Sequence, residues 1–361
     1  MRVVIAPDSC KGTAPAAAFA AAIAEGWRSE RPDDEVVVVP MADGGEGTAD
    51  ALAAAVPGSE RVPVTVTGPD DRPVDTTWLR LPDGRAVVEL AATSGLPLLE
   101  TLRPDDAHTT GFGQAIVAAL DAGAIGLVLG IGGSASTDGG IGLLQALGLR
   151  VDAPAGRTGS ALLDHVPPVD VTGLRALPPL GVRVLTDVTS PLLGPDGAAA
   201  VFGPQKGVTP GRVSVHDARL ARWAACFPDV DPTTPGAGAA GGAGFGLLVW
   251  GATLGGGAAA VGDVVGLAEA VRGADVVVTG EGRFDAQTAA GKVPSVVTAL
   301  ALEARARVML VAGEVAAPVD AFSAAASLTV IATQTTGEPD DALRDPLRFA
   351  RIAGARLALR A

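Results

Sequence analysis

The fold is decided by residues 1–56, MRVVIAPDSCKGTAPAAAFAAAIAEGWRSERPDDEVVVVPMADGGEGTADALAAAV. Residues 3–5 and 35–40 form two short, mainly apolar segments, which is typical of buried strands. The alanine-rich stretch 15–30 between them repeats large apolar side chains at helical spacing, which predicts a helix. A glycine-rich turn at 43–47 then leads into a second alanine-rich helix. This alternation of strand and helix predicts a doubly wound parallel sheet of the α/β class.

The character of the chain changes near residue 61. Strand-like segments joined by proline- and glycine-containing turns predict an antiparallel meander at 62–67, 74–81 and 86–90. Helix–strand–helix texture then returns at 110–149. The simplest account is one parallel α/β domain interrupted by a second, mixed α/β domain, with the active site between them. Later buried strands are expected at 182–185, 275–279, 308–312 and 328–332.

Composition and charge exclude several classes of partner. Of the 361 residues 48% are apolar but only 3% are aromatic, so the core must be built from Ala, Val, Leu and Ile. The net charge of −13 repels nucleic acid and anionic membrane surfaces. We therefore expect a small-molecule substrate, no nucleic-acid partner and no membrane partner. The sequence does not fix the oligomeric state.

The cysteines and the absence of a sorting signal bear on location. Cys10 and Cys226 lack the spacing of metal ligands, and the three histidines lie far apart in the sequence. The N-terminal segment begins as a strand, without the long apolar region of a secretion signal. Residues 236–262 carry no charge, but their glycine content argues against a membrane-spanning helix. The sequence thus predicts a cytoplasmic protein with reduced thiols.

The lysines point to functional loops. Only three of the 27 basic side chains are lysines, Lys11, Lys206 and Lys292, and each has a glycine neighbour. The chain also lacks Asn and Tyr, which indicates a bias that removes Lys, Asn and Tyr wherever another residue serves. Arginine cannot replace the compact ammonium group in a tight anion site. We therefore expect these lysines to face phosphate or carboxylate groups, with chance survival as the alternative.

Seven segments combine glycine with polar side chains at strand ends or in loops. Open parallel sheets bind ligands at the carboxyl ends of their strands, and glycines there expose backbone N–H groups that bind anions. A tight turn with a capping side chain is the alternative for any single segment, but seven of them favour a site. They are residues 8–12, 41–48, 132–140, 187–191, 202–207, 236–242 and 279–285.

Common nucleotide and hydrolase motifs do not explain these segments. There is no Gly-x-x-x-x-Gly-Lys-Ser/Thr and no Gly-x-Ser-x-Gly. Residues 236–241 fit Gly-x-Gly-x-x-Gly, but prolines rather than a strand precede them, so a loop that packs closely or cradles a phosphate is preferred. Carboxylates, lysines and Arg283 together suit phosphoryl transfer, which needs metal ligands, cations and an acid that orients a hydroxyl. The carboxylates are Asp8, Asp43, Glu46, Asp138, Asp187, Glu281 and Asp285.

Along nearly its full length the sequence resembles the bacterial glycerate kinase family of the two-domain type. The resemblance implies ATP-dependent phosphorylation of D-glycerate with Mg²⁺, and a flavodoxin-like domain interrupted by a second mixed α/β domain. Cys10 stands where the family usually has an aromatic residue, and Thr137 and Ser190 stand where Asn is expected, which affects fine substrate positioning more than the reaction class. The matching stretches are 6–9 with Lys11, 41–48, 132–140, 187–188 with 191–192, 202–207, 236–242, and 279–285 with 287–288 and 291–292.

The resemblance and the change in texture together set the expected domain boundaries. The flavodoxin-like domain is expected to comprise residues 1–60, 106–150 and 266–361. The mixed α/β domain is expected to comprise residues 61–105 and 151–265.

Roles for the candidate residues are inferred from their chemistry. Asp187 is expected to orient or accept the proton of the substrate hydroxyl, with an Asx-turn as the alternative. Asp43 and Glu46 can serve a metal, but they also have the spacing of a capping box. The catalytic set is Asp187, Lys206, Lys11 and Arg283; the substrate set is Asp8, Ser9, Asp43, Gly44, Gly45 and Ser134; the nucleotide set is Gly280, Glu281, Gly282, Asp285 and Lys292; the metal set is Asp43, Glu46 and Glu281.

Two further expectations concern the whole site. The three lysines are expected to converge on one cleft, with Lys292 facing the ATP phosphates and Lys11 or Lys206 facing the glycerate carboxylate. A non-catalytic sensor of a small anionic hydroxy acid is the alternative function, and it would need no metal ligands. The sequence leaves open whether the 2- or the 3-hydroxyl is phosphorylated, and whether related acids are accepted.

Overall fold

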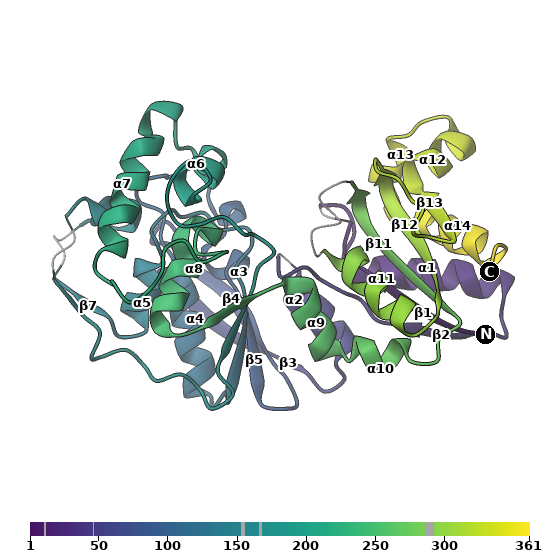
Figure 1. The fold of residues 1–361 in the computed structure, drawn as a ribbon, viewed down its shortest axis with the longest axis horizontal. Helices are drawn as coiled ribbons and strands as arrows, with labels where there is room; N and C mark the ends of the chain where they lie inside the picture. The colour runs from purple at the N-terminus through teal and green to yellow at the C-terminus, as the bar shows by residue number, and fades with distance from the viewer. Residues whose placement is uncertain (11, 46, 153–155, 166–167, 286–291) are drawn as a thin grey trace. The chain divides into compact units, whose positions relative to one another are not determined.

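The computed structural model describes residues 1–361 except 11, 46, 153–155, 166–167 and 286–291, and the chain folds into two compact units (Figure 1). Unit 1 comprises Met1–Asp43, Asp50–Pro57 and Gly256–Ala361. Unit 2 comprises Gly44–Ala49 and Gly58–Gly255.

Unit 1 is built on a five-stranded sheet in which every neighbouring pair is parallel. In chain order the strands are arranged 2-1-3-4-5, which is the flavodoxin-like order. The doubly wound, flavodoxin-like prediction for this unit is therefore confirmed. Across the sheet the strands are β2 (Glu35–Val38), β1 (Arg2–Pro7), β11 (Val276–Phe284), β12 (Arg307–Val315) and β13 (Ala324–Ser327).

Helices cover both faces of this sheet. On one face Phe19, Ile23 and Trp27 of α1 are fully buried in a core shared with α12, α14 and the strands. A side chain at Gly26 would place its Cβ 1.8 Å from the Arg351 carbonyl oxygen, so glycine is what lets α1 and α14 cross closely. The helices of this face are α1 (Ala16–Glu30), α12 (Leu328–Thr336) and α14 (Pro346–Ala358); α11 (Val293–Glu303) covers the other face, and α9 (Gly257–Val265), α10 (Leu267–Val271) and α13 (Asp341–Arg344) complete the unit.

Unit 2 contains a six-stranded mixed sheet of order β10-β9-β6-β5-β4-β3. Its first four strands run parallel, whereas β4 and β3 continue from β5 as an antiparallel meander, as the sequence predicted. The strands are β3 (Glu60–Thr67), β4 (Pro73–Arg80), β5 (Arg85–Glu89), β6 (Gly126–Gly130), β9 (Val182–Leu185) and β10 (Thr253–Gly255), and β7 (Arg150–Val151) pairs separately with β8 (Val169–Asp170).

The helices of unit 2 are mostly short, and none in the described part of the chain combines the length and hydropathy that a membrane span requires. The α-helices are α3 (Ala91–Ser94), α4 (Thr110–Asp121), α5 (Ile141–Ala146), α6 (Ala198–Phe202), α7 (Val213–Ala224) and α8 (Ala239–Trp250), while α2 (Thr48–Ala55) carries the chain between the units. The 3₁₀ turns are η1 (Leu96–Leu98), η2 (Gly159–Asp164), η3 (Pro204–Lys206) and η4 (Pro210–Arg212).

Three features differ from the sequence-based expectations. Residues 106–150, expected in the flavodoxin-like domain, lie in unit 2, because strand β6 pairs with β5 and β9 rather than with the strands of unit 1. The return to unit 1 also comes earlier than expected, at Gly256. Residues 328–332 form the start of helix α12 rather than a strand, since Leu328, Ile331 and Ala332 are buried together at helical spacing.

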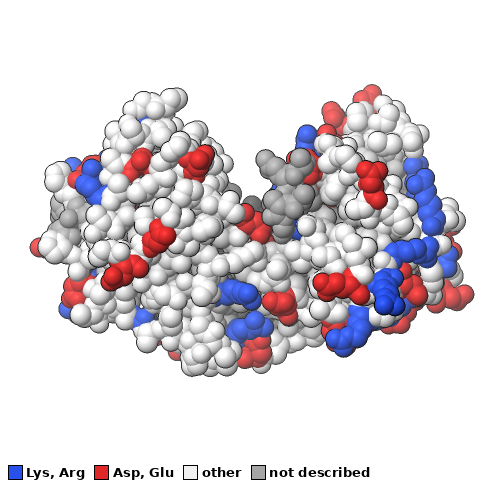
Figure 2. All heavy atoms as spheres, in the orientation of Figure 1, with Lys and Arg blue, Asp and Glu red and all other residues white. Residues whose placement is uncertain are grey.

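The surface is sparsely charged on the face drawn in Figure 2. Acidic and basic side chains are interspersed there, and no continuous field of basic groups covers the described residues of that face. This pattern agrees with the net charge of −13, which disfavours nucleic-acid binding.

Candidate functional site

A pocket lies at the carboxyl ends of β1 and β11, the strands at which the order of the unit 1 sheet reverses. Pro7 of β1 is paired with Gly280 of β11, and the Asp8 backbone N–H donates to the Gly280 carbonyl at 2.8 Å. Asp8, just past the end of β1, and Glu281, still within β11, therefore lie side by side. In open α/β folds this switch point is where ligands bind.

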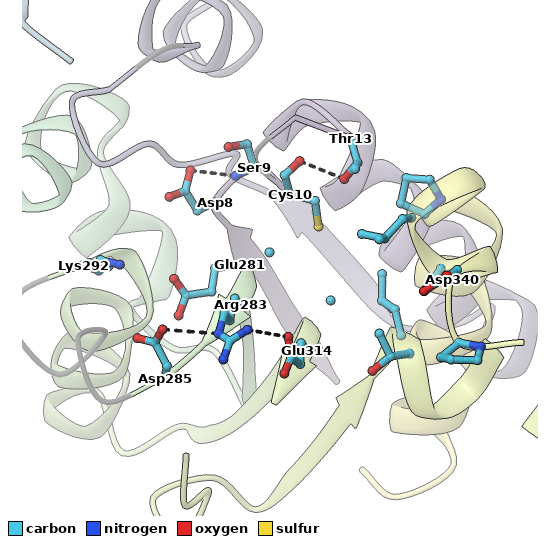
Figure 3. Close-up of a pocket in the computed structure, with 18 residues that line it drawn as sticks. Asp8, Ser9, Cys10, Thr13, Glu281, Arg283, Asp285, Lys292, Glu314 and Asp340 are labelled. Atoms are coloured by element: carbon cyan, nitrogen blue, oxygen red, sulfur yellow. Dashed lines mark hydrogen bonds and ion pairs between the residues drawn. The ribbon is translucent and has the colours of Figure 1, made fainter. Parts of the chain in front are cut away.

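The pocket has a volume of 520 Å³ and brings together residues that the sequence assigned to a site. Figure 3 shows Asp8, Glu281 and Lys292 around one side of it, with Arg283 and Asp285 beside them. Ser9, from the loop after β1, and Gly282, from strand β11, also contribute to the lining. Among the pocket residues from the sequence-predicted sets are Asp8, Ser9, Glu281, Gly282, Arg283, Asp285 and Lys292.

Two carboxylates are nearly buried at this edge: Asp8 is 5% exposed and Glu281 is 6% exposed. Asp8 Oδ1 accepts a hydrogen bond of 2.6 Å from the Ser9 backbone N–H. Burial raises the pKa of the nearby Cys10 thiol to about 12, and the negative charges of Asp8 and Glu281 add to the effect. Cys10 is therefore a buried thiol and not a nucleophile at neutral pH.

The two described cations of the pocket differ in their partners. The Arg283 guanidinium donates to Glu314 at 2.8 Å and lies 3.5 Å from Asp285, so its charge is balanced by carboxylates. Lys292 occupies the N-cap position of α11, where its side chain lines the pocket. A lysine at a helix N-terminus adds its charge to that of the exposed backbone N–H groups, which favours an anionic ligand.

The segment after β2 contributes to both units. The Met41 backbone N–H donates to the Pro7 carbonyl at 2.9 Å, which brings the chain leading to Asp43 to the same carboxyl edge as Asp8. Helix α2 begins only at Thr48, too far along the chain for Asp43 to be its N-cap residue. Gly44 belongs to unit 2, and at φ +87° a Cβ there would lie 2.5 Å from the Leu185 side chain. The expected metal ligand Glu46 and the catalytic candidate Lys11 lie outside the described residues.

Lys206 is deeply buried in unit 2, with 2% exposure. Its ammonium group donates to the Ser136 carbonyl and, at 3.3 Å, to the Ser134 hydroxyl. Burial lowers its pKa to about 7, although the nearby Asp138 carboxylate opposes this shift. Ser134, a predicted substrate ligand, also donates to the Ala240 carbonyl at 3.1 Å. The second lysine of the predicted set is thus part of a tightly bonded cluster of loops.

Asp138 organises this cluster, although the sequence placed it only among the candidate carboxylates and in none of the four predicted sets of site residues. Its carboxylate accepts from the Thr109 backbone and hydroxyl at 2.9 and 2.8 Å, from the Ser136 hydroxyl at 3.1 Å and from the Gly140 backbone at 3.2 Å. The signal was present, because Asp138 is the acid of the glycine-rich segment 132–140.

The loop that follows β9 holds Asp187, the predicted base, at the carboxyl edge of the unit 2 sheet. Gly236 packs against this loop, since a Cβ there would lie 3.2 Å from the Val188 carbonyl oxygen. Residues 240–242 all have left-handed backbone conformations, and the Gly241 carbonyl accepts from the Gly139 backbone N–H at 3.0 Å. The glycine-rich segment is therefore a closely packed loop and not the strand-preceded dinucleotide motif.

The structure thus brings some of the predicted site residues together and leaves others apart. Asp8, Ser9, Glu281, Arg283, Asp285 and Lys292 line one pocket in unit 1, whereas Ser134 and Lys206 form one cluster in unit 2. Among the described residues no three His, Cys, Asp or Glu side chains are grouped as metal ligands. The convergence of the three lysines stays a prediction.

The chain belongs to the glycerate kinase family, whose family model matches residues 3–358. It is 41% identical to the glycerate 2-kinase of Escherichia coli K12 over 87% of this chain and 85% of that one. It is 43% identical to the glycerate kinase of Bacillus subtilis 168 over 81% of this chain and 80% of that one. A crystal structure from Salmonella typhimurium LT2 that carries the name glycerate kinase 2 matches 99% of this chain and 97% of its own, with a TM-score of 0.87 and 38% identity.

Proposed function

We propose that this protein transfers the γ-phosphoryl group of ATP to a hydroxyl group of D-glycerate with the help of Mg²⁺. Membership of the glycerate kinase family supports the kinase reaction and its acceptor. The observation that supports ATP as the phosphoryl donor is the 520 Å³ pocket at the switch point of unit 1. Lys292 and the two nearly buried carboxylates, Asp8 and Glu281, line this pocket. We also propose a cytoplasmic location, where the two free thiols stay reduced.

In this proposal the nucleotide binds in the pocket of unit 1. Lys292 and the N-terminus of α11 face its phosphates, and Gly282 lets the backbone approach them. Gly280, of the predicted nucleotide set, is paired within the sheet beside this pocket. Asp285 and Glu281 complete the predicted nucleotide set.

Mg²⁺ fits the same pocket because its donors are oxygens of carboxylates and phosphates. Asp8 follows β1 and Glu281 lies in the adjacent strand β11, both with little exposure, so their carboxylates would hold the ion together with phosphate oxygens. Asp43 and Glu46 remain candidates from the loop after β2. Bound there, Mg²⁺ would neutralise charge that develops on the phosphates during transfer.

The proposed glycerate ligands are Ser9 in unit 1 and Gly44, Gly45 and Ser134 in unit 2. Asp187 would orient the attacking hydroxyl and accept its proton. Lys206 would act through Ser134, to whose hydroxyl its ammonium group donates. Because the similar Escherichia coli enzyme is a glycerate 2-kinase, we propose that the 2-hydroxyl is the acceptor.

A coupled assay of ADP release tests this function. ATP with D-glycerate should give ADP only when Mg²⁺ is present, and phosphorus NMR of the product should show phosphate on the 2-position. Phosphate on the 3-position would overturn the choice of hydroxyl but leave the kinase reaction intact. If D-glycerate binds and no ADP forms under any metal condition, the protein is a sensor and the proposal is wrong.

A further inference from the structure

The pocket of unit 1 is chemically divided. Its charged end is formed by Asp8 after β1, by Glu281 and Arg283 of strand β11, and by Lys292. Its other end comes from the C-terminal helices, which Figure 3 shows on the side opposite Lys292, where Asp340 is labelled. The lining of this second end is mostly apolar: Leu328, Pro339, Ala342, Leu343 and Pro346 are joined by the polar residues Thr329 and Asp340.

A substrate without an apolar part would leave this second end unused. Glycerate is polar at every carbon, and a phosphate chain carries only charge. A nucleotide is divided in the same way as the pocket, with phosphates at one end and a flat base with apolar faces at the other. The volume of 520 Å³ lies in the range of pockets that enclose ligands of nucleotide size.

We infer that the apolar end of this pocket binds the adenine base of the nucleotide, against α12, α13 and the start of α14. The inference rests on the proposed nucleotide site and assigns the orientation of the ligand within it. Phosphates lie toward Lys292, and the base lies against Leu343 and its neighbours. In this orientation the base removes apolar side-chain surface from water, which favours binding.

Leu343 is the side chain that tests this assignment. Leu328 and Ala342 are 1% and 4% exposed, so they belong to the core of unit 1 and form a fixed floor. Leu343 is 62% exposed in helix α13, and its apolar surface meets the pocket rather than the core. Its replacement therefore changes the pocket without removing a core contact.

The experiment compares Leu343→Ser with Leu302→Ser. Leu302 is a matched control, because it is 59% exposed on α11 of the same unit and does not line the pocket. Isothermal titration calorimetry in the presence of Mg²⁺ measures the binding of ADP and of tripolyphosphate, which has the phosphates but no base. Thermal melting of each variant checks the fold, and steady-state assays give KM for ATP and for D-glycerate.

We expect Leu343→Ser to weaken ADP binding and raise KM for ATP by about tenfold, with tripolyphosphate binding and KM for D-glycerate unchanged. Leu302→Ser should match the wild type in every measurement. Unchanged ADP affinity, or an equal loss for ADP and tripolyphosphate, would overturn the base assignment, as would a wild-type protein that binds no ADP. If the wild type fails to phosphorylate glycerate while Leu343→Ser still loses ADP selectively, the proposed function fails and the base assignment stands.

Discussion

Lys206 is a basic side chain in the interior of unit 2, and burial of its charged form lowers the free energy of unfolding. Its pKa is lowered by burial to about 7, from an ordinary value of 10.5. Between these two values the unfolded chain holds a proton that the folded protein has lost, so the free energy of unfolding rises with pH in this window. Below pH 7 both states are protonated and the dependence disappears.

We therefore predict that the wild type gains stability relative to Lys206→Met between about pH 7 and 10, at up to about 1.4 kcal/mol per pH unit. Urea denaturation at several pH values measures the difference. The chain suits this test because it has no Tyr and only three Lys, so few other groups titrate there. Parallel pH profiles for the two proteins would show that Lys206 keeps an ordinary pKa.

His216 gives a second prediction, at acidic pH. Burial, reinforced by the charge of Arg219, lowers its pKa to about 4 from 6.5. Its Nδ1 lies 2.9 Å from the Ser160 hydroxyl. Between pH 6.5 and 4 the unfolded chain binds a proton that the folded protein excludes, so stability is lost as pH falls through this window. Asp164, whose pKa is held at about 2 chiefly by hydrogen bonds from Arg219, loses its contribution only below pH 3.8.

Replacement of His216 by Gln should flatten the loss of stability between pH 6.5 and 4 while leaving the loss below pH 3.8. Equilibrium unfolding of both proteins across this range is the measurement. An equally steep decline for His216→Gln and wild type from pH 6.5 would assign the acid sensitivity to other groups.

At the scale of the elements, the crossing of α1 and α14 depends on the missing side chain of Gly26. A Cβ there would lie 1.8 Å from the Arg351 carbonyl oxygen and 2.9 Å from the Ala355 backbone nitrogen, and neither backbone atom can move alone. Gly26→Ala should therefore lower the free energy of unfolding by at least about 2 kcal/mol. Gly211→Ala is the control, because nothing lies within 4 Å of its Cβ position, and its effect should stay within about 0.5 kcal/mol. Equal melting of the two variants would contradict the close crossing.

The elements also show which structural features can be predicted from the sequence. The strand-end segments led to the pocket at Asp8 and Glu281, because the carboxyl ends of adjacent parallel strands must meet at one edge. The run at 328–332 was wrongly predicted to be a strand, because a short apolar run fits a buried strand or a helix equally well. The apolar end of the pocket at 339–346 was missed, because ordinary helix residues carry no local signal of the ligand they face.

At the scale of the molecule, the division of the chain into its two units was not predicted correctly from the sequence. Strand β6 is a short apolar run with glycine at both ends, and such a run fits either parallel sheet. Its partners are β5 and β9, whose paired residues lie 41 positions earlier (Glu89 for Gly130) and 55 positions later (Leu185 for Gly130). Local patterns do not encode pairing over such distances. The same separation divides the chemistry, because Lys292 belongs to unit 1 and Asp187 to unit 2.

That division makes the role of Asp187 separable from nucleotide binding. If Asp187 accepts the hydroxyl proton, Asp187→Asn should lower kcat by about 10²–10⁴ and leave the affinity of the unit 1 pocket for ADP unchanged. Asp231→Asn is a suitable control from the same unit, since Asp231 accepts from the Thr233 backbone and hydroxyl in a surface turn, and its turnover should match the wild type. Single-turnover kinetics with bound ATP separates the transfer step from binding. Wild-type turnover in a folded Asp187→Asn protein would show that another group accepts the hydroxyl proton and that Asp187 has only a structural role in its loop.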